Sequence, residues 1–218
     1  MPSEPLVLAF DTSAAHCAAA LLAGERVLAS RHEEMAKGQA ERLMPMLEEV
    51  LAWAGTGWRD LAAIGVGVGP GNFTGVRIAV AAARGLALSL GIPAIGVSTL
   101  EARAHALPRP LTVIEDARRD AVYWQEFGTD GMGAPALDAL ADLPARIAAP
   151  GALTGSAAAL ASPRLPGTRV LAPAMPMAEA IARIAAARRG MPQPRPAPLY
   201  LRGADAAPPA DPPPVILP

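Results

Sequence analysis

The chain has 218 residues, 52% of them hydrophobic and only 4% aromatic, so its core must be built mainly from aliphatic side chains in one large or two small domains. With a net charge of −1, the chain has no excess of positive charge with which it could bind a nucleic-acid backbone by itself. The single cysteine, Cys17, excludes an internal disulfide and fits a reducing compartment.

The first half of the chain predicts a meander of strands followed by strands that alternate with helices. The expected segments are strands over 6–10, 17–23 and 26–30, a helix over 39–54, a strand over 64–68, a helix running to 90, a strand over 94–97 and a short helix to 107. Gly24-Glu25 is the predicted hairpin turn, and Ser98 and Thr99 are candidate caps for the last helix. A meander followed by crossover helices indicates a mixed sheet with helices packed on it.

The second half gives weaker signals after a hinge at 108–110, which reads Pro-Arg-Pro. The expected segments are strands over 111–115 and 121–127, followed by a weaker α/β alternation that comprises 136–149, a short strand near 152–155 and 177–189. Residues 191–218 contain 10 prolines, so no regular core is expected there, although Tyr200 and Leu201 are candidates to dock this tail locally.

The most informative stretch, residues 69–79, reads GPGNFTGVRIA between a strand and a helix. Gly69, Gly71 and Gly75 allow a sharp turn and a close approach to another group, and Asn72 and Thr74 are candidates to cap the helix. Free N–H groups at such a junction attract phosphates, so a nucleotide site is one interpretation.

The known phosphate motifs do not fit this glycine turn. Val76 and Arg77 follow Gly75, where a Walker loop needs Lys and then Ser or Thr, and the dinucleotide fingerprint lacks its third glycine. Pro70 removes one N–H donor. A structural turn is therefore favoured over a phosphate site.

The helix that follows the turn is apolar nearly all round over 78–88, although a helix on one sheet needs only one apolar stripe. A central core helix of an alanine-rich protein is slightly favoured by this pattern alone, and a helix-to-helix protein interface is the alternative. No membrane span is expected, because the longest apolar run, 78–95, includes Arg84 and Pro93. The N-terminus lacks the pattern of a signal peptide, so a cytoplasmic location is expected.

The catalytic motifs examined are absent from the chain. It has no HExxH and no GxSxG, and His16 should point away from its neighbour Cys17 on a strand. The spacing of His16, His32 and His105 indicates incidental residues more than a metal site. Asp11, at a strand end, is interpreted as an acceptor for nearby backbone N–H groups.

Five segments in one order resemble the bacterial TsaB (YeaZ) family over about residues 6 to 202. They are FDTS at 10–13, AERLMPML at 40–47, GPGNFTGVRIA at 69–79, EDARRDAVYW at 115–124 and PLYLR at 198–202. The resemblance implies an α/β, two-lobed fold of the actin, sugar-kinase and Hsp70 (ASKHA, ribonuclease H-like) type, a mixed sheet with flanking helices. It divides the chain into a first lobe over 1–107 with the partner interface, a smaller lobe over 108–203 and a proline-rich tail over 204–218.

The resemblance also implies a function without catalysis by this chain. The related subunit TsaD transfers a threonylcarbamoyl group to N6 of adenosine 37 in tRNAs that read ANN codons, and the family's members activate it as heterodimers that the ATPase TsaE joins. They can also self-associate through the same first-lobe helices. TsaD holds a metal with two histidines one helical turn apart and an Asp, a pattern that the helix over 39–54 lacks. The resemblance also places Asp11 where a kinase of this fold has a carboxylate near Mg²⁺ and phosphate, so an ATP-dependent phosphotransferase of the same fold is the alternative function.

The expected site is therefore a protein interface, and no catalytic, cofactor or metal residue is expected in this chain. Contact with tRNA is expected only through the complex. Whether a nucleotide binds between the two partners is left open. Its residues on the helix are Phe73, Thr74, Arg77, Val80, Ala81, Arg84 and Leu88, next to the glycine turn of Gly69, Pro70, Gly71, Asn72 and Gly75. Gln39 stands where many relatives have His. For Arg118 and Arg119 a solvated turn is favoured over contact with phosphate, because Asp116 and Asp120 flank them.

Overall fold

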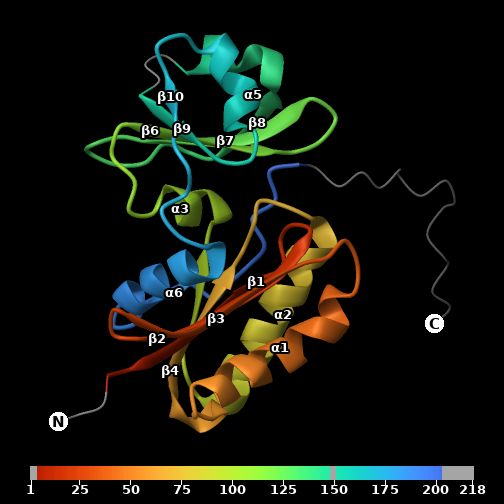
Figure 1. Cartoon of the computed structure of the whole chain (residues 1–218), viewed down its shortest axis with the longest axis vertical. Coiled ribbons are helices and arrows are strands. Elements are labelled where there is room, and N and C mark those ends of the chain that lie inside the picture. The colour runs from red at the N-terminus through yellow and green to blue at the C-terminus, as the bar shows by residue number, and fades with distance from the viewer. Residues whose placement is uncertain (1–3, 148–150, 203–218) are drawn as a thin grey trace, which may run out of the picture.

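The structure is a computed structural model and describes residues 4–147 and 151–202. Two five-stranded sheets form two lobes, one above the other, as Figure 1 shows. The predicted tail over 204–218 lies outside the described residues.

The first sheet has the strand order β3-β2-β1-β4-β5. Its strands are β1 (Leu6–Asp11), β2 (His16–Ala23), β3 (Arg26–Glu34), β4 (Leu61–Gly67) and β5 (Ala94–Val97). β1 pairs antiparallel with β2 and parallel with β4, which confirms the mixed sheet expected from a meander followed by crossovers. Gly24 turns the β2–β3 hairpin with a φ of 56°, a conformation that glycine adopts without steric cost.

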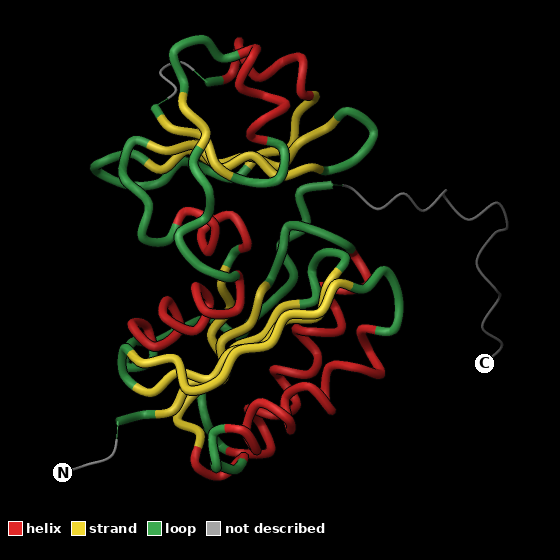
Figure 2. The backbone as a smooth tube through the Cα atoms, in the orientation of Figure 1, coloured by secondary structure: helices red, strands yellow, loops and turns green. Residues whose placement is uncertain are grey.

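Helices cover both faces of the first sheet. α1 (Gln39–Trp53) and α2 (Phe73–Leu90) lie on one face, and α6 (Met177–Arg188) lies on the other, an arrangement visible in Figure 2. The strands alternate accordingly, since Cys17 joins the core beneath α1 and α2 whereas Ala18 packs against Ala178 of α6. Gly65 allows α6 to come close, because a Cβ there would lie 2.9 Å from the Cβ of Ala185.

The second sheet has the strand order β10-β9-β6-β7-β8. Its elements are β6 (Leu111–Asp116), β7 (Ala121–Phe127), β8 (Ala136–Ala139), β9 (Ala152–Thr154) and β10 (Arg169–Val170), with the short helices α4 (Leu143–Arg146) and α5 (Ala158–Ala161) on one face. The 3₁₀ turns η2 (Leu140–Asp142) and η3 (Ser162–Arg164) precede and follow these helices, and η1 (Trp58–Asp60) precedes β4 in the first lobe.

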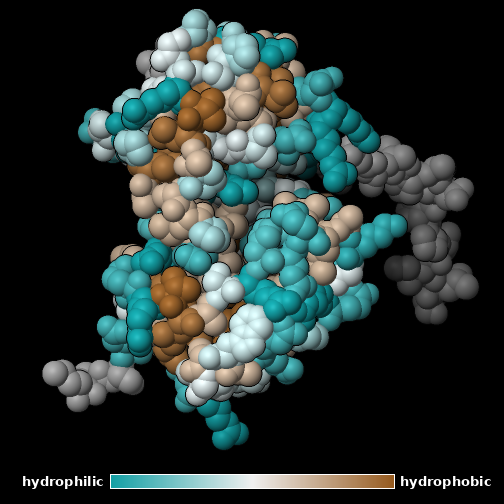
Figure 3. Space-filling model, viewed as in Figure 1, coloured by the Kyte–Doolittle hydropathy of each residue, from teal (hydrophilic) through white to brown (hydrophobic). Residues whose placement is uncertain are grey.

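α3 (Thr99–Ala104) connects the lobes, because Leu100 and Ala104 pack with apolar residues of the second sheet. Its Arg103 bonds to Glu115 of β6 at 2.9 Å. Its Glu101 forms an ion pair with Arg188 of α6, so charged contacts from this short helix reach both lobes. In Figure 3 the two lobes are in contact with each other, and apolar patches lie over both of them.

Most elements lie where the sequence predicts them, with β3 running on to Glu34 and α1 accommodating Pro45 within the helix. The predicted division assigned residues 177–189 to the second lobe, with the rest of 108–203. The structure places α6 on the first sheet instead, because its buried Ile181 and Ala185 match the apolar face left open by β1, β4 and β5. The chain therefore returns to the first lobe after building the second.

An ion-pair network fastens edge strand β3 to α1. Arg42 donates from Nε and Nη2 to Glu33 at 2.7 and 2.8 Å, and from Nη1 and Nη2 to Glu49 at 2.8 and 2.7 Å. The hydrogen bond from Arg42 is the main cause that lowers the pKa of Glu33 to about 2, from an ordinary value of 4.5. A carboxyl whose pKa is lower in the folded state stabilises the fold above its unfolded pKa.

We therefore predict that this stabilisation is present above pH 4.5 and is lost as the pH falls toward about 2. Glu33→Gln should lower the free energy of unfolding at neutral pH, and its difference from the unmodified protein should shrink toward zero near pH 2. Urea unfolding followed by circular dichroism at a series of pH values measures this difference. Glu48→Gln, on the exposed side of α1, is the matched control; an equal pH-dependent loss in that variant would contradict the assignment to Glu33.

Candidate functional site

The glycine turn brings the head of α2 against the end of β1. A Cβ at Gly75 would overlap the carbonyl oxygen of Thr12, and a Cβ at Gly71 would overlap that of Ser13. The Thr12 hydroxyl donates to the Gly75 carbonyl oxygen at 2.7 Å, and the Asn72 N–H donates to the Ser13 carbonyl oxygen at 2.6 Å. Only glycine permits these backbone approaches, so the sequence pattern reflects packing.

Several backbone groups of the turn form hydrogen bonds within the protein itself. Asn72 caps α2 as predicted, since its side chain accepts from the Gly75 N–H at 3.0 Å. Gly69 has a φ of 86°, and its carbonyl oxygen accepts from the Thr99 N–H at 2.9 Å. The Thr99 hydroxyl donates to the carbonyl oxygen of Pro70 at 3.0 Å. These contacts support the structural turn that the sequence favoured over a phosphate site.

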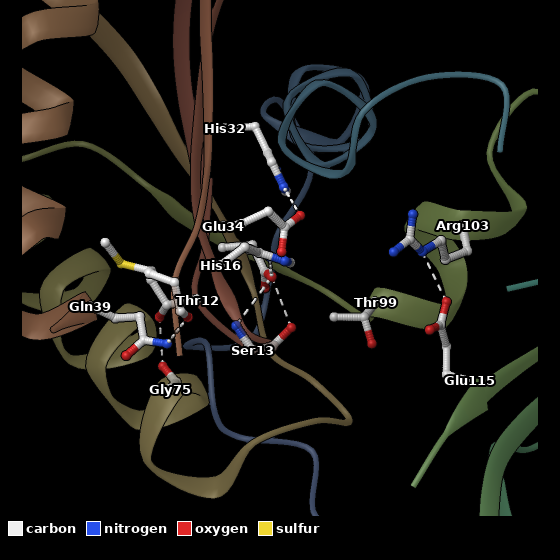
Figure 4. A network of polar contacts seen from close by, with 12 residues as sticks. Thr12, Ser13, His16, His32, Glu34, Gln39, Gly75, Thr99, Arg103 and Glu115 are labelled. Carbon is white, nitrogen blue, oxygen red and sulfur yellow. Dashed lines mark hydrogen bonds and ion pairs between the residues drawn. The ribbon is translucent and has the colours of Figure 1, made fainter. Parts of the chain in front are cut away.

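Asp11 is fully buried and contacts Ser13 and His16, which Figure 4 labels within a network of polar contacts. Its Oδ2 accepts from the Ser13 N–H at 3.1 Å and from the Ser13 hydroxyl at 2.8 Å, and it lies 2.7 Å from Nε2 of His16. Its Oδ1 has no hydrogen-bond partner among the described residues and faces Gly67, where a Cβ would overlap it. The bond from the Ser13 N–H is of the kind expected for a strand-end acceptor, whereas the contacts with the Ser13 hydroxyl and with His16 are additional side-chain contacts.

The histidines and the cysteine show no arrangement for nucleophilic or metal chemistry. The rings of His16 and His32 lie 5.0 Å apart and are tilted by 46°, and His32 in turn bonds to Glu34 at 2.7 Å. Burial raises the pKa of the Cys17 thiol to about 11, so this thiol stays protonated at neutral pH. Within 4–147 and 151–202, no three or more His, Cys, Asp and Glu residues are grouped so that they could hold a metal ion.

α2 presents two different faces. Its inner face, with Val76, Ala79 and Ala83, is buried on the first sheet. Most of the predicted interface residues lie on the outer face: Phe73, Thr74, Arg77, Ala81 and Leu88 are exposed, and Arg84 is half-buried. Leu88 is 82% exposed.

Val80 differs from the other predicted interface residues. Its side chain is only 3% exposed, so direct contact with a partner is not supported at this position. The reason is helical spacing: Val80 follows Val76 by four residues and therefore shares its sheet-facing side. No described element covers the outer face, so the helix that looks apolar all round is buried on one side only.

The remaining residues singled out in the sequence have local partners. Gln39 donates from Nε2 to the Met35 carbonyl oxygen at 3.0 Å. Arg118 and Arg119 lie in an exposed turn with positive φ values of 61° and 53°, and the Arg118 N–H donates to Asp116 at 2.8 Å.

The sequence did not predict the contact between Tyr200 and Arg77. Tyr200 was expected to dock the tail, and it does so on α2, where its hydroxyl accepts from Nε of Arg77 at 2.7 Å. No periodic pattern in the proline-rich segment could have indicated which element it meets, because the two residues are 123 positions apart.

The two lobes, each a mixed sheet with flanking helices, have the two-lobed fold of the actin, sugar-kinase and Hsp70 type. Residues 26–178 match the family model described as "TsaD: tRNA N6-adenosine threonylcarbamoyltransferase". A solved structure of YeaZ from Pseudomonas aeruginosa is 33% identical, with a TM-score of 0.70 over 90% of this chain and 100% of that one. The chain belongs to the TsaB/YeaZ family.

Two sequence relatives agree with this assignment. The chain is 38% identical over 133 residues to the tRNA threonylcarbamoyladenosine biosynthesis protein TsaB of Escherichia coli (strain K12), a match that covers 58% of this chain and only 57% of that protein. It is 36% identical over 207 residues to an uncharacterized protein of Mycobacterium tuberculosis (strain ATCC 25618 / H37Rv), covering 93% and 94% of the two chains.

The close approach of α2 to β1 gives a direct test of the glycine turn. Gly75→Ala should lower the free energy of unfolding by about 1–3 kcal/mol, because the added methyl group forces apart well-packed backbones. Thermal unfolding followed by circular dichroism measures the change.

Gly85→Ala is the matched control, since nothing lies within 4 Å of a Cβ at that position of the same helix. It should stabilise the protein by about 0.8–1 kcal/mol through helix propensity. Equal effects of the two substitutions would contradict the packing role of Gly75.

Proposed function

We propose that this chain is a non-catalytic subunit in the biosynthesis of threonylcarbamoyladenosine on tRNA. It activates a TsaD-type catalytic subunit by forming a heterodimer, which modifies N6 of adenosine 37 in tRNAs that read ANN codons. The family membership and the name of the Escherichia coli relative support the pathway.

The observation that carries the proposal is the uncovered outer face of α2. Phe73 and Leu88, both large and apolar, are 48% and 82% exposed at opposite ends of this helix. Small residues between them, such as Ala81 and Gly85, leave room for another helix to come close. An exposed apolar strip with small central residues fits a helical protein partner.

α2 is also, among the described residues, the helix long and apolar enough by composition to cross a membrane. That is weak evidence, because helices in the cores of soluble proteins pass the same test. Arg77 and Arg84 interrupt its less buried side, and its inner side is committed to the first sheet. A protein surface therefore explains the apolar strip better than lipid does.

The proposed absence of catalysis by this chain has support from the site. α1 contains no histidine, so it offers none of the imidazole ligands that the resemblance assigns to TsaD. Several amides of the glycine turn are bonded within the protein, as described above. Catalysis and metal binding are therefore assigned to the partner, and a nucleotide, if one is held, is assigned to the junction between partners.

The other partners follow from the same assignment. TsaE joins the heterodimer as the ATPase, and tRNA is contacted through the complex. The same α2 face is available for self-association when the chain is alone, and light scattering of the isolated chain distinguishes a homodimer from a monomer. The proposed location is the cytoplasm, where tRNA modification takes place.

The test is light scattering with size exclusion on this chain, alone and mixed with TsaD from the same organism. We expect a one-to-one species that Leu88→Glu weakens, because a charge would be buried in the apolar strip. Leu160→Glu is the matched control, since Leu160 is 61% exposed on α5 of the other lobe. Absence of a complex, with and without nucleotide and TsaE, would overturn the proposal.

The alternative, an ATP-dependent phosphotransferase with Asp11 at its centre, has less support. Oδ2 of Asp11 is occupied by Ser13 and His16, and Oδ1 is enclosed against Gly67. We predict that isothermal titration of the isolated chain with millimolar ATP and Mg²⁺ gives no binding. Nucleotide binding with turnover that Asp11→Asn abolishes would reinstate the phosphotransferase.

A further inference from the structure

Phe73, Arg77 and Tyr200 form an exposed cluster at the head of α2, here named the Arg77 cluster. The guanidinium carbon of Arg77 lies 3.7 Å from the centre of the Phe73 ring and 5.7 Å from that of Tyr200. The two rings lie 5.1 Å apart, and the Arg77 Nε donates to the Tyr200 hydroxyl at 2.7 Å. The guanidinium is therefore held by stacking and by a directional hydrogen bond.

The chain on both sides of Tyr200 is also fixed. The Leu199 N–H donates to the Val68 carbonyl oxygen at 2.8 Å, at the start of the glycine turn. Arg202 donates to the Ala117 carbonyl oxygen at 3.0 Å, in the second lobe. Pro196 is buried next to Gly96. This segment thus presents the Tyr200 hydroxyl to Arg77 from a fixed backbone, although it has no regular secondary structure.

The terminal nitrogens of Arg77, Nη1 and Nη2, have no hydrogen bond or ion pair among the described residues. Between residues 61 and 100 the chain contains no Asp or Glu, and its only charges there are Arg77 and Arg84. A guanidinium fixed through Nε leaves its outer edge free for two parallel hydrogen bonds, the geometry that suits a carboxylate or phosphate.

The surroundings favour a carboxylate from a protein. Phe73 is 48% exposed and Tyr200 45% exposed, and large aromatic side chains beside an arginine are typical of the anchors of protein interfaces. The cluster continues into the apolar strip of α2 that ends at Leu88. An RNA backbone would instead need several neighbouring cations, and the described head of α2 offers Arg77 alone.

We propose that Arg77 is the charged anchor of the partner interface and binds a carboxylate of the protein partner, and that Tyr200 is a positioning residue that fixes the guanidinium for this contact. This inference rests on the proposed function, because it assumes that the outer face of α2 meets a protein. It adds the chemical nature of the partner surface and a role for the C-terminal segment. Preorganisation by Tyr200 reduces the entropy lost on binding.

The test measures the affinity of the full chain for TsaD of the same organism by isothermal titration at two salt concentrations. Arg77→Glu should weaken binding by about 30-fold or more, the loss typical of an interface anchor. Arg77→Gln should weaken it less and should reduce its salt dependence, because an ion pair is lost. Arg59→Glu is the matched control: it makes the same charge change at an exposed residue before β4, whereas α2 follows the other end of that strand.

The positioning role of Tyr200 has its own readout. Tyr200→Phe keeps the ring and removes only the hydroxyl, and it should weaken binding by about three- to tenfold, the cost of one neutral hydrogen bond. In the Arg77→Gln background the same substitution should have no effect, since there is no guanidinium left to position. Additive effects of the two substitutions would overturn the positioning role.

The outcomes separate this inference from the proposed function. If Arg77→Glu binds as well as the unmodified chain while Leu88→Glu does not, the interface stands and the anchor is refuted. If Arg77→Glu changes only the affinity for tRNA, measured by fluorescence anisotropy, a phosphate contact replaces the carboxylate and the inference is overturned. If the unmodified chain does not bind TsaD, both proposals fail.

Discussion

The close contact between the head of α2 and the end of β1 determines the arrangement of the rest of the first lobe. Gly71 and Gly75 leave space for the carbonyl groups of Ser13 and Thr12, and the hydrogen bonds across this contact set the direction in which α2 begins. Because the helix is rigid, that direction determines which of its residues face the sheet. The same contact therefore decides that Arg77 and Leu88 face outward.

The second lobe is joined to the first through α3 and through the segment around Tyr200, which limits how far the chain can be divided into independent parts. α3 packs on the second sheet while its Glu101 pairs with α6, and the segment around Tyr200 runs from the glycine turn to the β6–β7 hairpin. α6 itself supplies one whole layer of the first lobe. A shorter chain lacking α6 would leave the apolar face of β1 and β4 uncovered, so the first lobe needs sequence from both halves.

The binding role proposed for this two-lobed fold depends on the exposed side of α2. Asp11 and the glycine turn form hydrogen bonds with residues close to them in the chain: Asp11 bonds to Ser13, and the Gly75 N–H bonds to Asn72. The groups available to a partner lie instead on the outside of α2. They are the exposed apolar side chains of Phe73 and Leu88 and the terminal nitrogens of Arg77, which have no partner among the described residues. The function proposed for the chain thus depends on a surface and not on a cleft.

The sequence alone determined the order and type of most elements and limited the cap of α2 to Asn72 or Thr74, because these depend on contacts between near neighbours in the chain. It also indicated that α2 has more apolar surface than one sheet can cover. Only the tertiary structure decided that Val80 is buried, that α6 belongs to the first sheet and that Tyr200 meets Arg77. These depend on contacts between distant segments, and local periodicity contains no information about which segments meet.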